Sequence, residues 1–239
     1  KSKKLDIIIN CGAYTNVDGA EENEALASKI NGMAPGIIAK YCNSTNTRLI
    51  QISTDYVFDG NGNVPITEDD IPNPLSIYGK TKLEGERKIL SCLNNAYIFR
   101  TAWVYSEFGK NFLKTMLKLA KNKTELKVVY DQVGCPTYAH DLATSIEKII
   151  NQWPENDTPG IYNLSNHGVT SWFDFARAIF EISGYNIDVK PVLSSEFQTK
   201  AQRPKYSVLQ KEKVCSTFNL DIPYWKDSLK TCMSKLQID

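Results

Sequence analysis

Short hydrophobic runs alternate along this chain with longer segments of helical periodicity. Each run has five to seven residues and is rich in β-branched or aromatic side chains, which is typical of strands buried in a parallel sheet. The first run is expected to be buried on both faces. The predicted strands are Leu5 to Cys11, Arg48 to Ser53, Ala96 to Thr101, Leu126 to Tyr130 and Gly160 to Leu164.

The segments between these runs repeat their apolar residues at helical spacing. Gly32 and Pro35 are expected to divide the first helix, and Gly85 lies inside the second. A glycine in mid-helix costs about 1 kcal/mol relative to alanine, so a close packing contact is the expected reason for Gly85. The predicted helices are Glu21 to Tyr41, Ser76 to Asn94, Asn111 to Lys121 and Tyr138 to Asn151.

Regular alternation of strands and helices predicts an α/β fold. We expect a Rossmann-like, doubly wound parallel sheet with helices on both faces. After residue 167 the pattern changes to a helix, a strand and two short helices, predicted at Ser171 to Ser183, Asp188 to Val192, Gln210 to Phe218 and Trp225 to Leu236. The sequence therefore predicts two parts, a sheet domain over residues 1–167 and a small α/β part over residues 168–239.

Composition excludes several classes of function. With 28 basic and 27 acidic residues in 239, and no basic block, nucleic acid is not an expected partner. No apolar run approaches the roughly 20 residues of a membrane span. Six scattered cysteines without a Cys-x-x-Cys motif indicate reduced thiols in a cytoplasm, and two distant histidines, His140 and His167, do not suggest a metal site.

Tyr78 and Lys82 are the first candidates for chemistry. Four residues apart on a helix, their side chains meet on one face. A nearby ammonium favours the phenolate, which predicts a lowered pKa for Tyr78 and proton transfer near neutral pH. Chance alone would give about one such spacing in a chain of this length, so the surrounding residues must decide.

Polar residues follow one of the predicted strands and small residues another, at their carboxyl ends, where open α/β sheets bind ligands. Ser53-Thr54-Asp55 ends the second strand, although such a run could equally cap a helix or start a turn. Gly12-Ala13 ends the first strand and allows either a ligand or a tight turn. The loop from Tyr56 to Pro74 is longer than a plain connection needs, and such loops are often functional.

Several motifs, taken in order, resemble the extended short-chain dehydrogenase/reductase family, in its dTDP-4-dehydrorhamnose reductase branch. The resemblance covers nearly the whole chain. Its motifs are Ser53-Thr54-Asp55-Tyr56-Val57-Phe58, Pro74-Leu75-x-x-Tyr78-Gly79-Lys80-Thr81-Lys82-Leu83-x-Gly85-Glu86, Arg100-Thr101-Ala102-Trp103-Val104-Tyr105, Asn111-Phe112, Asp131-Gln132-x-Gly134-x-Pro136-Thr137 and Arg203-Pro204.

The resemblance implies a hydride transfer from NADPH or NADH to the C4 keto group of a dTDP-4-dehydro-6-deoxy sugar, giving dTDP-L-rhamnose. Tyr78 would be the proton donor, Lys82 would hold the nicotinamide ribose and lower the phenol's pKa, and Thr54 would complete the triad. The remaining implied contacts are Cys11, Gly12 and Ala13 to the cofactor, Asp55 and Trp103 to the sugar, and Arg203 to the diphosphate. Core packing remains an alternative for Trp103, and a surface ion pair remains one for Arg203.

Tyr56 follows Asp55 where related dehydratases carry glutamate, which favours a simple reductase. The glycine-rich fingerprint that holds a dinucleotide's pyrophosphate is not found, so the first strands of the cofactor domain are expected to be missing. The choice between NADH and NADPH therefore stays open. A non-catalytic binding protein, similar to the β subunit of methionine adenosyltransferase, is the alternative function, and a homodimer is a further expectation.

Overall fold

The computed structural model describes residues 5–153 and 157–236. Its centre is a four-stranded parallel sheet in the order β1-β2-β3-β8. The strands are β1 (Ile7–Asn10), β2 (Arg48–Thr54), β3 (Ala96–Thr101) and β8 (Gly160–Asn163). The predicted parallel, Rossmann-like sheet is confirmed.

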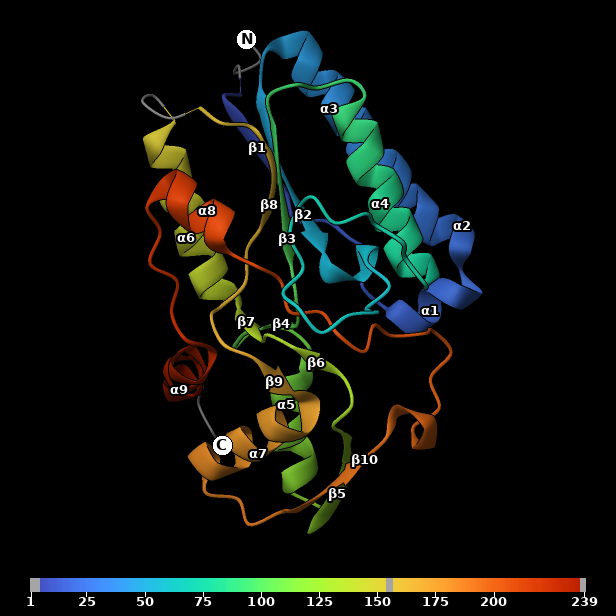
Figure 1. Cartoon of the computed structure of the whole chain (residues 1–239), viewed down its shortest axis with the longest axis vertical. Coiled ribbons are helices and arrows are strands. Elements are labelled where there is room, and N and C mark those ends of the chain that lie inside the picture. The colour runs from blue at the N-terminus through green and yellow to red at the C-terminus, as the bar shows by residue number, and fades with distance from the viewer. Residues whose placement is uncertain (1–4, 154–156, 237–239) are drawn as a thin grey trace.

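Helices cover both faces of this sheet (Figure 1). One face packs against α3 (Ala34–Thr45) and α4 (Ile77–Leu90), the other against α6 (Ala139–Gln152) and α8 (Glu212–Phe218). Neighbouring residues of β2 alternate between the two cores, because successive strand side chains point to opposite faces. Leu49 packs with α3 and α4, whereas Ile50 packs with α6 and α8.

The predicted first helix is not interrupted at Gly32 and Pro35, because the backbone stays helical through Met33 and Ala34 and only the hydrogen-bond pattern changes there, from π-helical to α-helical. It begins with α1 (Val17–Glu22) and α2 (Glu24–Ala27) and continues through a π-helical segment, Ser28–Met33, into α3. Pro35 lies in the first turn of α3, where its missing backbone N–H costs no helical hydrogen bond.

One prediction for β1 was wrong. The strand exists, but within the described part of the chain it pairs with β2 alone, so it is an edge strand. Ile9 is 47% exposed, and Ile7 and Ile8 are only half-buried. An unbroken apolar run indicates a strand but does not determine how many layers cover it.

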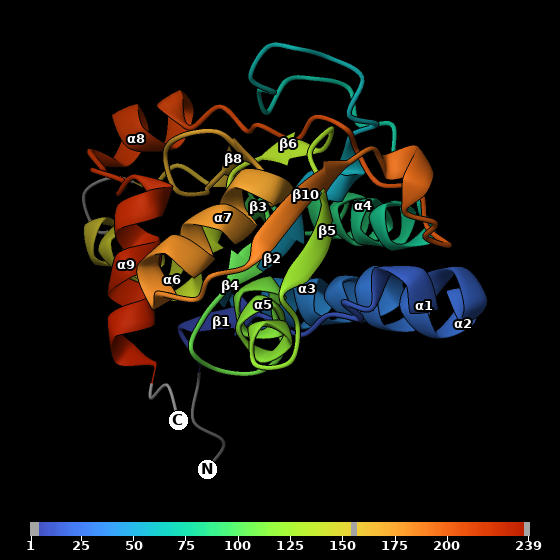
Figure 2. The same cartoon turned by 90° about the horizontal axis from the view of Figure 1, so that it is seen from below.

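A second core lies below the main sheet. Here β5 (Glu125–Val129) pairs in parallel with β10 (Asp188–Val192), below the four-stranded sheet in Figure 1 and in front of it in Figure 2. The two strands pack with α5 (Phe112–Ala120), α7 (Trp172–Ser183) and α9 (Trp225–Lys235). The division at residue 167 stays a prediction, and segments from both sides of it share this core.

Four two-residue strands were not predicted. They connect the two cores as the pairs β4 with β7 and β6 with β9. Their bounds are Val104–Tyr105 for β4, Val133–Gly134 for β6, Thr137–Tyr138 for β7 and Thr170–Ser171 for β9. So short a strand carries no readable periodicity of its own.

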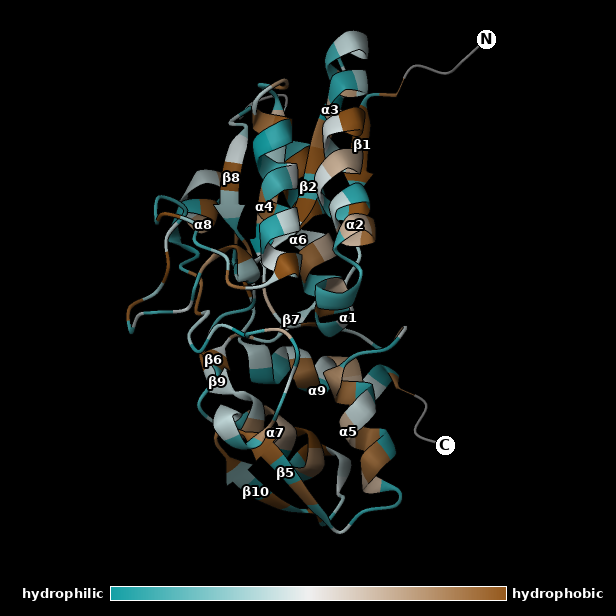
Figure 3. Ribbon diagram, turned by 90° about the vertical axis from the view of Figure 1, so that its right-hand side faces the viewer, coloured by the Kyte–Doolittle hydropathy of each residue, from teal (hydrophilic) through white to brown (hydrophobic). Residues whose placement is uncertain are grey.

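Hydropathy follows these layers. In Figure 3 the strands β1, β2 and β5 are largely hydrophobic, whereas α4 is largely hydrophilic and buries Leu83 and Ile89 among its few apolar residues. Among the described residues, no helix combines the length and the apolar character that crossing a membrane requires.

Gly85 allows α4 to approach the π-helical segment closely. A Cβ built on Gly85 would lie 2.2 Å from the backbone oxygen of Asn31 and 3.3 Å from Pro35. The close packing contact expected for this mid-helix glycine is therefore confirmed. The obstacle is main chain, which cannot move aside as a flexible side chain could.

Replacing Gly85 by alanine should therefore destabilise the protein. We expect Gly85→Ala to lower the free energy of unfolding by about 1–3 kcal/mol, the usual cost of overpacking. Gly62→Ala is the matched control, because a Cβ on Gly62 would meet nothing within 4 Å. Urea unfolding of both variants measures the difference, and equal stabilities would contradict this account of α4 packing.

Candidate active site

Helix α4 directs one face toward the end of β2. The helix begins after Ser76, whose side chain accepts a hydrogen bond from the N–H of Gly79 at 3.1 Å. Tyr78, Lys82 and Glu86 follow at four-residue intervals, so they share one face of the helix. Tyr78 and Lys82 thus share one face of one helix, as predicted, and a direct interaction between their side chains stays a prediction.

Lys82 is buried against β2. Its Nζ donates a hydrogen bond to the backbone oxygen of Ile52 at 2.6 Å, and the residue is only 5% exposed. Burial lowers the pKa of Lys82 to about 8, while the charge of Glu86 opposes that shift. The ammonium form therefore still predominates at neutral pH.

Tyr78 is held between Thr54 and Tyr56. Burial raises the pKa of Tyr78 to about 12, a side-chain hydrogen bond with Thr54 opposes the shift, and the charge of Asp55 adds to it. The ring of Tyr56 meets the ring of Tyr78 edge-on, with centroids 5.4 Å apart. The predicted lowering of this pKa was wrong, because burial and the charge of Asp55 together outweigh the hydrogen bond with Thr54.

Asp55 is a buried carboxylate directly after β2. Its Oδ1 accepts a hydrogen bond from the Thr54 hydroxyl at 3.0 Å, and Ser207 supplies a second side-chain hydrogen bond. Its Oδ2 has no partner within the described residues. Burial raises the pKa of Asp55 to about 6, although both hydrogen bonds oppose the shift.

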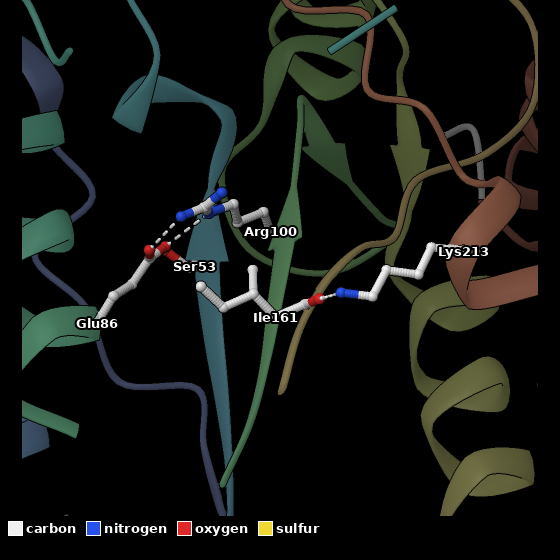
Figure 4. Close-up of polar contacts among 5 residues, drawn as sticks. All are labelled: Ser53, Glu86, Arg100, Ile161 and Lys213. Carbon is white, nitrogen blue, oxygen red and sulfur yellow. Dashed lines mark hydrogen bonds and ion pairs between the residues drawn. The ribbon is translucent and has the colours of Figure 1, made fainter. Parts of the chain in front are cut away.

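A buried ion pair anchors the other end of this helix face, and sequence reasoning missed it. The carboxylate of Glu86 accepts hydrogen bonds from Arg100 Nε at 3.1 Å and from a terminal nitrogen of Arg100 at 2.7 Å (Figure 4). Ser53 Oγ donates a further hydrogen bond to Glu86. The available signal was the spacing, since Glu86 continues the series of Tyr78 and Lys82.

Trp103 follows β3 in an unusual backbone conformation. Its φ angle is 50°, in the left-handed region that bulky residues rarely adopt. The indole stacks on Trp172, with ring centroids 3.6 Å apart and an interplanar angle of 8°. The side chain is half-buried, so it combines the packing role with a surface that a ligand could reach.

Arg203 forms an ion pair with Asp18 of α1, at 2.7 Å. The same carboxylate accepts the backbone N–H of Ala201 at 3.0 Å, so Asp18 holds the segment around Arg203 by two contacts. Arg203 also lowers the pKa of Tyr56, while burial and the charge of Asp55 keep that pKa above its usual value. The arginine therefore lies near the aromatic pair of Tyr56 and Tyr78.

A cleft of about 600 Å³ lies beside Arg203. Tyr78 and Lys82 do not line it, but Leu75, three residues before Tyr78, does. The cleft therefore leads toward the site from the side of the C-terminal segment. Its lining also includes Asp59, Asp131, Gln132, Ser194, Thr199 and Lys205.

The segment Cys11, Gly12 and Ala13 follows directly after β1. Cys11 and Gly12 are exposed, and Cys11 contributes to the electrostatics of Lys82. An ammonium has three donors, and Ile52 takes one, which leaves two for the hydroxyls of a ribose. Lys82 and this exposed segment fit the ribose side of a nicotinamide nucleotide. Within the described residues no group of three His, Cys, Asp or Glu side chains could hold a metal ion.

Comparisons with known proteins find relatives along nearly the whole chain. The dTDP-4-dehydrorhamnose reductase of Escherichia coli is 40% identical over 243 residues, which cover 99% of this chain and 81% of that protein. A crystal structure of a dTDP-4-dehydrorhamnose reductase from Clostridium acetobutylicum superposes with a TM-score of 0.92 at 45% identity, covering 97% of this chain and 81% of the other.

The dTDP-4-dehydrorhamnose reductase of Bacillus anthracis, solved in complex with NADP, gives a TM-score of 0.92 at 39% identity and covers 96% of this chain and 80% of the other. The family model described as "RmlD substrate binding domain" matches residues 1–238. Fold, site geometry and comparisons together identify this chain as a member of the RmlD substrate-binding domain family, within the extended short-chain dehydrogenases/reductases.

Proposed function

We propose that this protein reduces dTDP-4-dehydro-L-rhamnose to dTDP-L-rhamnose with NADPH or NADH. The observation that carries the proposal is the convergence of Tyr78, Lys82, Thr54 and Asp55 at the carboxyl end of β2. Relatives named for this reaction at about 40% identity, one of them solved with NADP, support it. They give no support to the non-catalytic alternative.

In this mechanism Tyr78 donates its hydroxyl proton to the C4 oxygen of the sugar. Lys82 would hold a reduced nicotinamide, whose chemistry would be to supply a hydride to C4; with the proton from Tyr78 the carbonyl then becomes a secondary alcohol and Tyr78 becomes a phenolate. An alkoxide is a stronger base than this phenolate, so proton transfer is favourable even though the pKa of Tyr78 is about 12. The Lys82 ammonium and the Thr54 hydroxyl then stabilise the phenolate.

The two sides of the site take the two ligands. Lys82 and the segment Cys11, Gly12 and Ala13 hold the nicotinamide ribose and the adjoining cofactor. On the other side Trp103 and Asp55 meet the sugar, and the unpartnered Oδ2 of Asp55 is an acceptor for a sugar hydroxyl.

Arg203 binds the diphosphate in this proposal. Its guanidinium suits paired phosphate oxygens, and the cleft beside it offers the space. Residues 168–239 thus supply the substrate-binding part, and residues 1–167 carry the catalytic residues. Asp18 forms an ion pair with Arg203, so the diphosphate of the substrate would have to share the guanidinium with this carboxylate.

The cysteines support a cytoplasmic location for this reaction. All six are free thiols, and Cys42, Cys135 and Cys232 are buried. Disulfides form in oxidising compartments, so a chain that leaves six thiols unpaired suits a reducing one.

We also propose that the protein forms a homodimer. A stripe of exposed apolar side chains runs along α2, the π-helical segment and α3, where a soluble surface helix would usually be polar. Its members recur at helical spacing: Leu26, Met33, Ile37 and Tyr41.

Removing the hydroxyl of Tyr78 tests the reaction. In the protein expressed from its complete reading frame, Tyr78→Phe should lower kcat for NAD(P)H oxidation with dTDP-4-dehydrorhamnose by about a hundredfold or more, because the proton donor is lost. Tyr105→Phe makes the same change at a buried tyrosine in the other core and should leave kcat unchanged. Unchanged turnover in Tyr78→Phe would contradict the mechanism. An inactive wild-type protein would favour the alternative of a non-catalytic binding protein.

The raised pKa of Asp55 predicts a pH-dependent stability. Its pKa is about 6 when folded against 3.8 ordinarily, so folding takes up a proton between these values and the free energy of unfolding falls as pH rises through them. The shift of about two units corresponds to roughly 3 kcal/mol. Asp55→Asn should therefore gain about that much stability relative to wild type between pH 4 and pH 7.

Urea unfolding at several pH values measures this gain, and Asp59 provides a control of opposite sign. Hydrogen bonds from Asn61 and Asn73 lower the pKa of Asp59. The contribution of Asp59 to the free energy of unfolding is therefore present above its ordinary pKa and is lost in acid. Asp59→Asn should thus become less stable than wild type as pH rises. Parallel stability curves for Asp55→Asn and wild type would contradict the buried carboxylate.

Light scattering tests the homodimer. Ile37 is 65% exposed within the apolar stripe, so Ile37→Glu should convert a dimer to a monomer by placing two charges in the interface. Ile71, which is 88% exposed in the loop after β2, is the control, and Ile71→Glu should remain dimeric. A monomeric wild-type protein contradicts the proposal, and a dimeric Ile37→Glu places the interface elsewhere.

A further inference from the structure

Two parallel indoles form a stack next to the proposed sugar site. The rings of Trp103 and Trp172 lie 3.6 Å apart at an angle of 8°, and both residues are half-buried. Trp103 comes from the segment after β3, whereas Trp172 is the first residue of α7. The stack therefore joins the main sheet to the second core.

The backbone of Trp103 needs such a partner. A bulky residue with a φ of 50° is strained, and strained conformations persist only where the surroundings hold them. Stacking on Trp172 covers one face of the Trp103 ring, and parallel stacking of two aromatic rings is favourable. The stacking energy thus offsets the strain of the left-handed backbone conformation of Trp103.

Gly134 allows the Trp103 ring and the Ser207 hydroxyl to pack closely against the same point of the backbone. A Cβ on Gly134 would lie 2.7 Å from the Trp103 ring and 2.8 Å from Ser207 Oγ. Ser207 in turn forms a hydrogen bond with Asp55. The ring of Trp103 and the hydroxyl that holds Asp55 therefore contact the same glycine, which places Trp103 next to the polar end of the site.

Trp172 is itself held firmly. Ser171 caps α7 by accepting the N–H of Asp174 at 3.0 Å, and it pairs with Val133 between β9 and β6. Phe112 packs on the Trp172 ring, with centroids 4.6 Å apart. A side chain fixed on a capped helix can hold a neighbour in place.

We propose that Trp172 is a positioning residue for the sugar. It does not touch the substrate but holds the Trp103 ring so that its free surface meets the apolar C–H face of the 6-deoxy sugar. Because it rests on the proposed function, this role requires that Trp103 contacts the substrate. It assigns to α7 a part in substrate specificity that neither the motifs nor the catalytic residues reveal.

Replacing the stacking partner tests the role. Trp172→Leu should raise KM for the sugar nucleotide about tenfold, the equivalent of one lost aromatic pair, with KM for NAD(P)H and kcat little changed. Trp172→Phe, which keeps an aromatic face, should recover most of this loss. Because Trp172 acts through Trp103, the double variant Trp103→Leu/Trp172→Leu should be no worse than Trp103→Leu alone.

Phe173→Leu is the control on the same helix, since its ring packs against the second core and lies under the guanidinium of Arg177. It should leave both KM values unchanged. Calorimetric binding of dTDP-rhamnose gives a second readout that needs no turnover, and Trp172→Phe covers the case in which Trp172→Leu does not fold.

The outcomes separate this proposal from the reaction itself. A wild-type protein that neither binds dTDP-rhamnose nor reduces its 4-keto form overturns the proposed function. A working wild type with an unchanged KM in Trp172→Leu overturns the positioning role alone. So do additive losses in the double variant, or an equal loss of affinity for NAD(P)H, because both would indicate a merely structural residue.

Discussion

The buried ion pair between Glu86 and Arg100 fixes the orientation of α4 on the sheet. Both side chains are 2% exposed, and Glu86 also accepts a hydrogen bond from Ser53. Breaking such a pair costs about 3–5 kcal/mol, because one charge is left buried without compensation. Helix α4 therefore cannot rotate about its axis, and Lys82 and Tyr78, one and two turns earlier, take their directions from this anchor. The charge of Glu86 also helps to keep Lys82 protonated in its buried position.

Glycines allow α4 to approach the end of β2 closely next to Tyr78. A Cβ on Gly79 would lie 2.1 Å from the backbone oxygen of Tyr56, so no other residue allows Tyr78 to lie so close to the end of β2. Gly85 lies in the interior of α4, where a glycine reduces the intrinsic stability of the helix by roughly 1 kcal/mol, whereas Gly79 lies in its first turn. Both glycines lie where α4 touches the backbone of another segment, Gly79 at Tyr56 and Gly85 at Asn31. The ion pair of Glu86 with Arg100 holds the helix to the sheet.

Local periodicity is sufficient to predict most elements but not their partners. Asp188–Val192 is a strand with the predicted bounds, and β5 was predicted within a residue at each end. That these two pair with each other, away from the main sheet, depends on contacts 63 residues apart, as between Glu125 and Asp188, which no local pattern contains. The site shows the same limit. The Tyr78 to Lys82 spacing is visible in the sequence, whereas the pKa of Tyr78 depends on burial, which the spacing does not report.

The ion pair between Asp18 and Arg203 bears on the phosphate-binding role proposed for this arginine. An arginine beside a cleft is costly to bury without a counter-charge, and the partly exposed carboxylate of Asp18 provides one. A partly exposed ion pair contributes about 0–1 kcal/mol, so a diphosphate that offers two charges and paired oxygens can compete for the same guanidinium. Ser194 binds Asp131 by two hydrogen bonds at the other end of the segment. The arginine is thus held near its proposed ligand by contacts weak enough to exchange, while the segment that carries it stays attached.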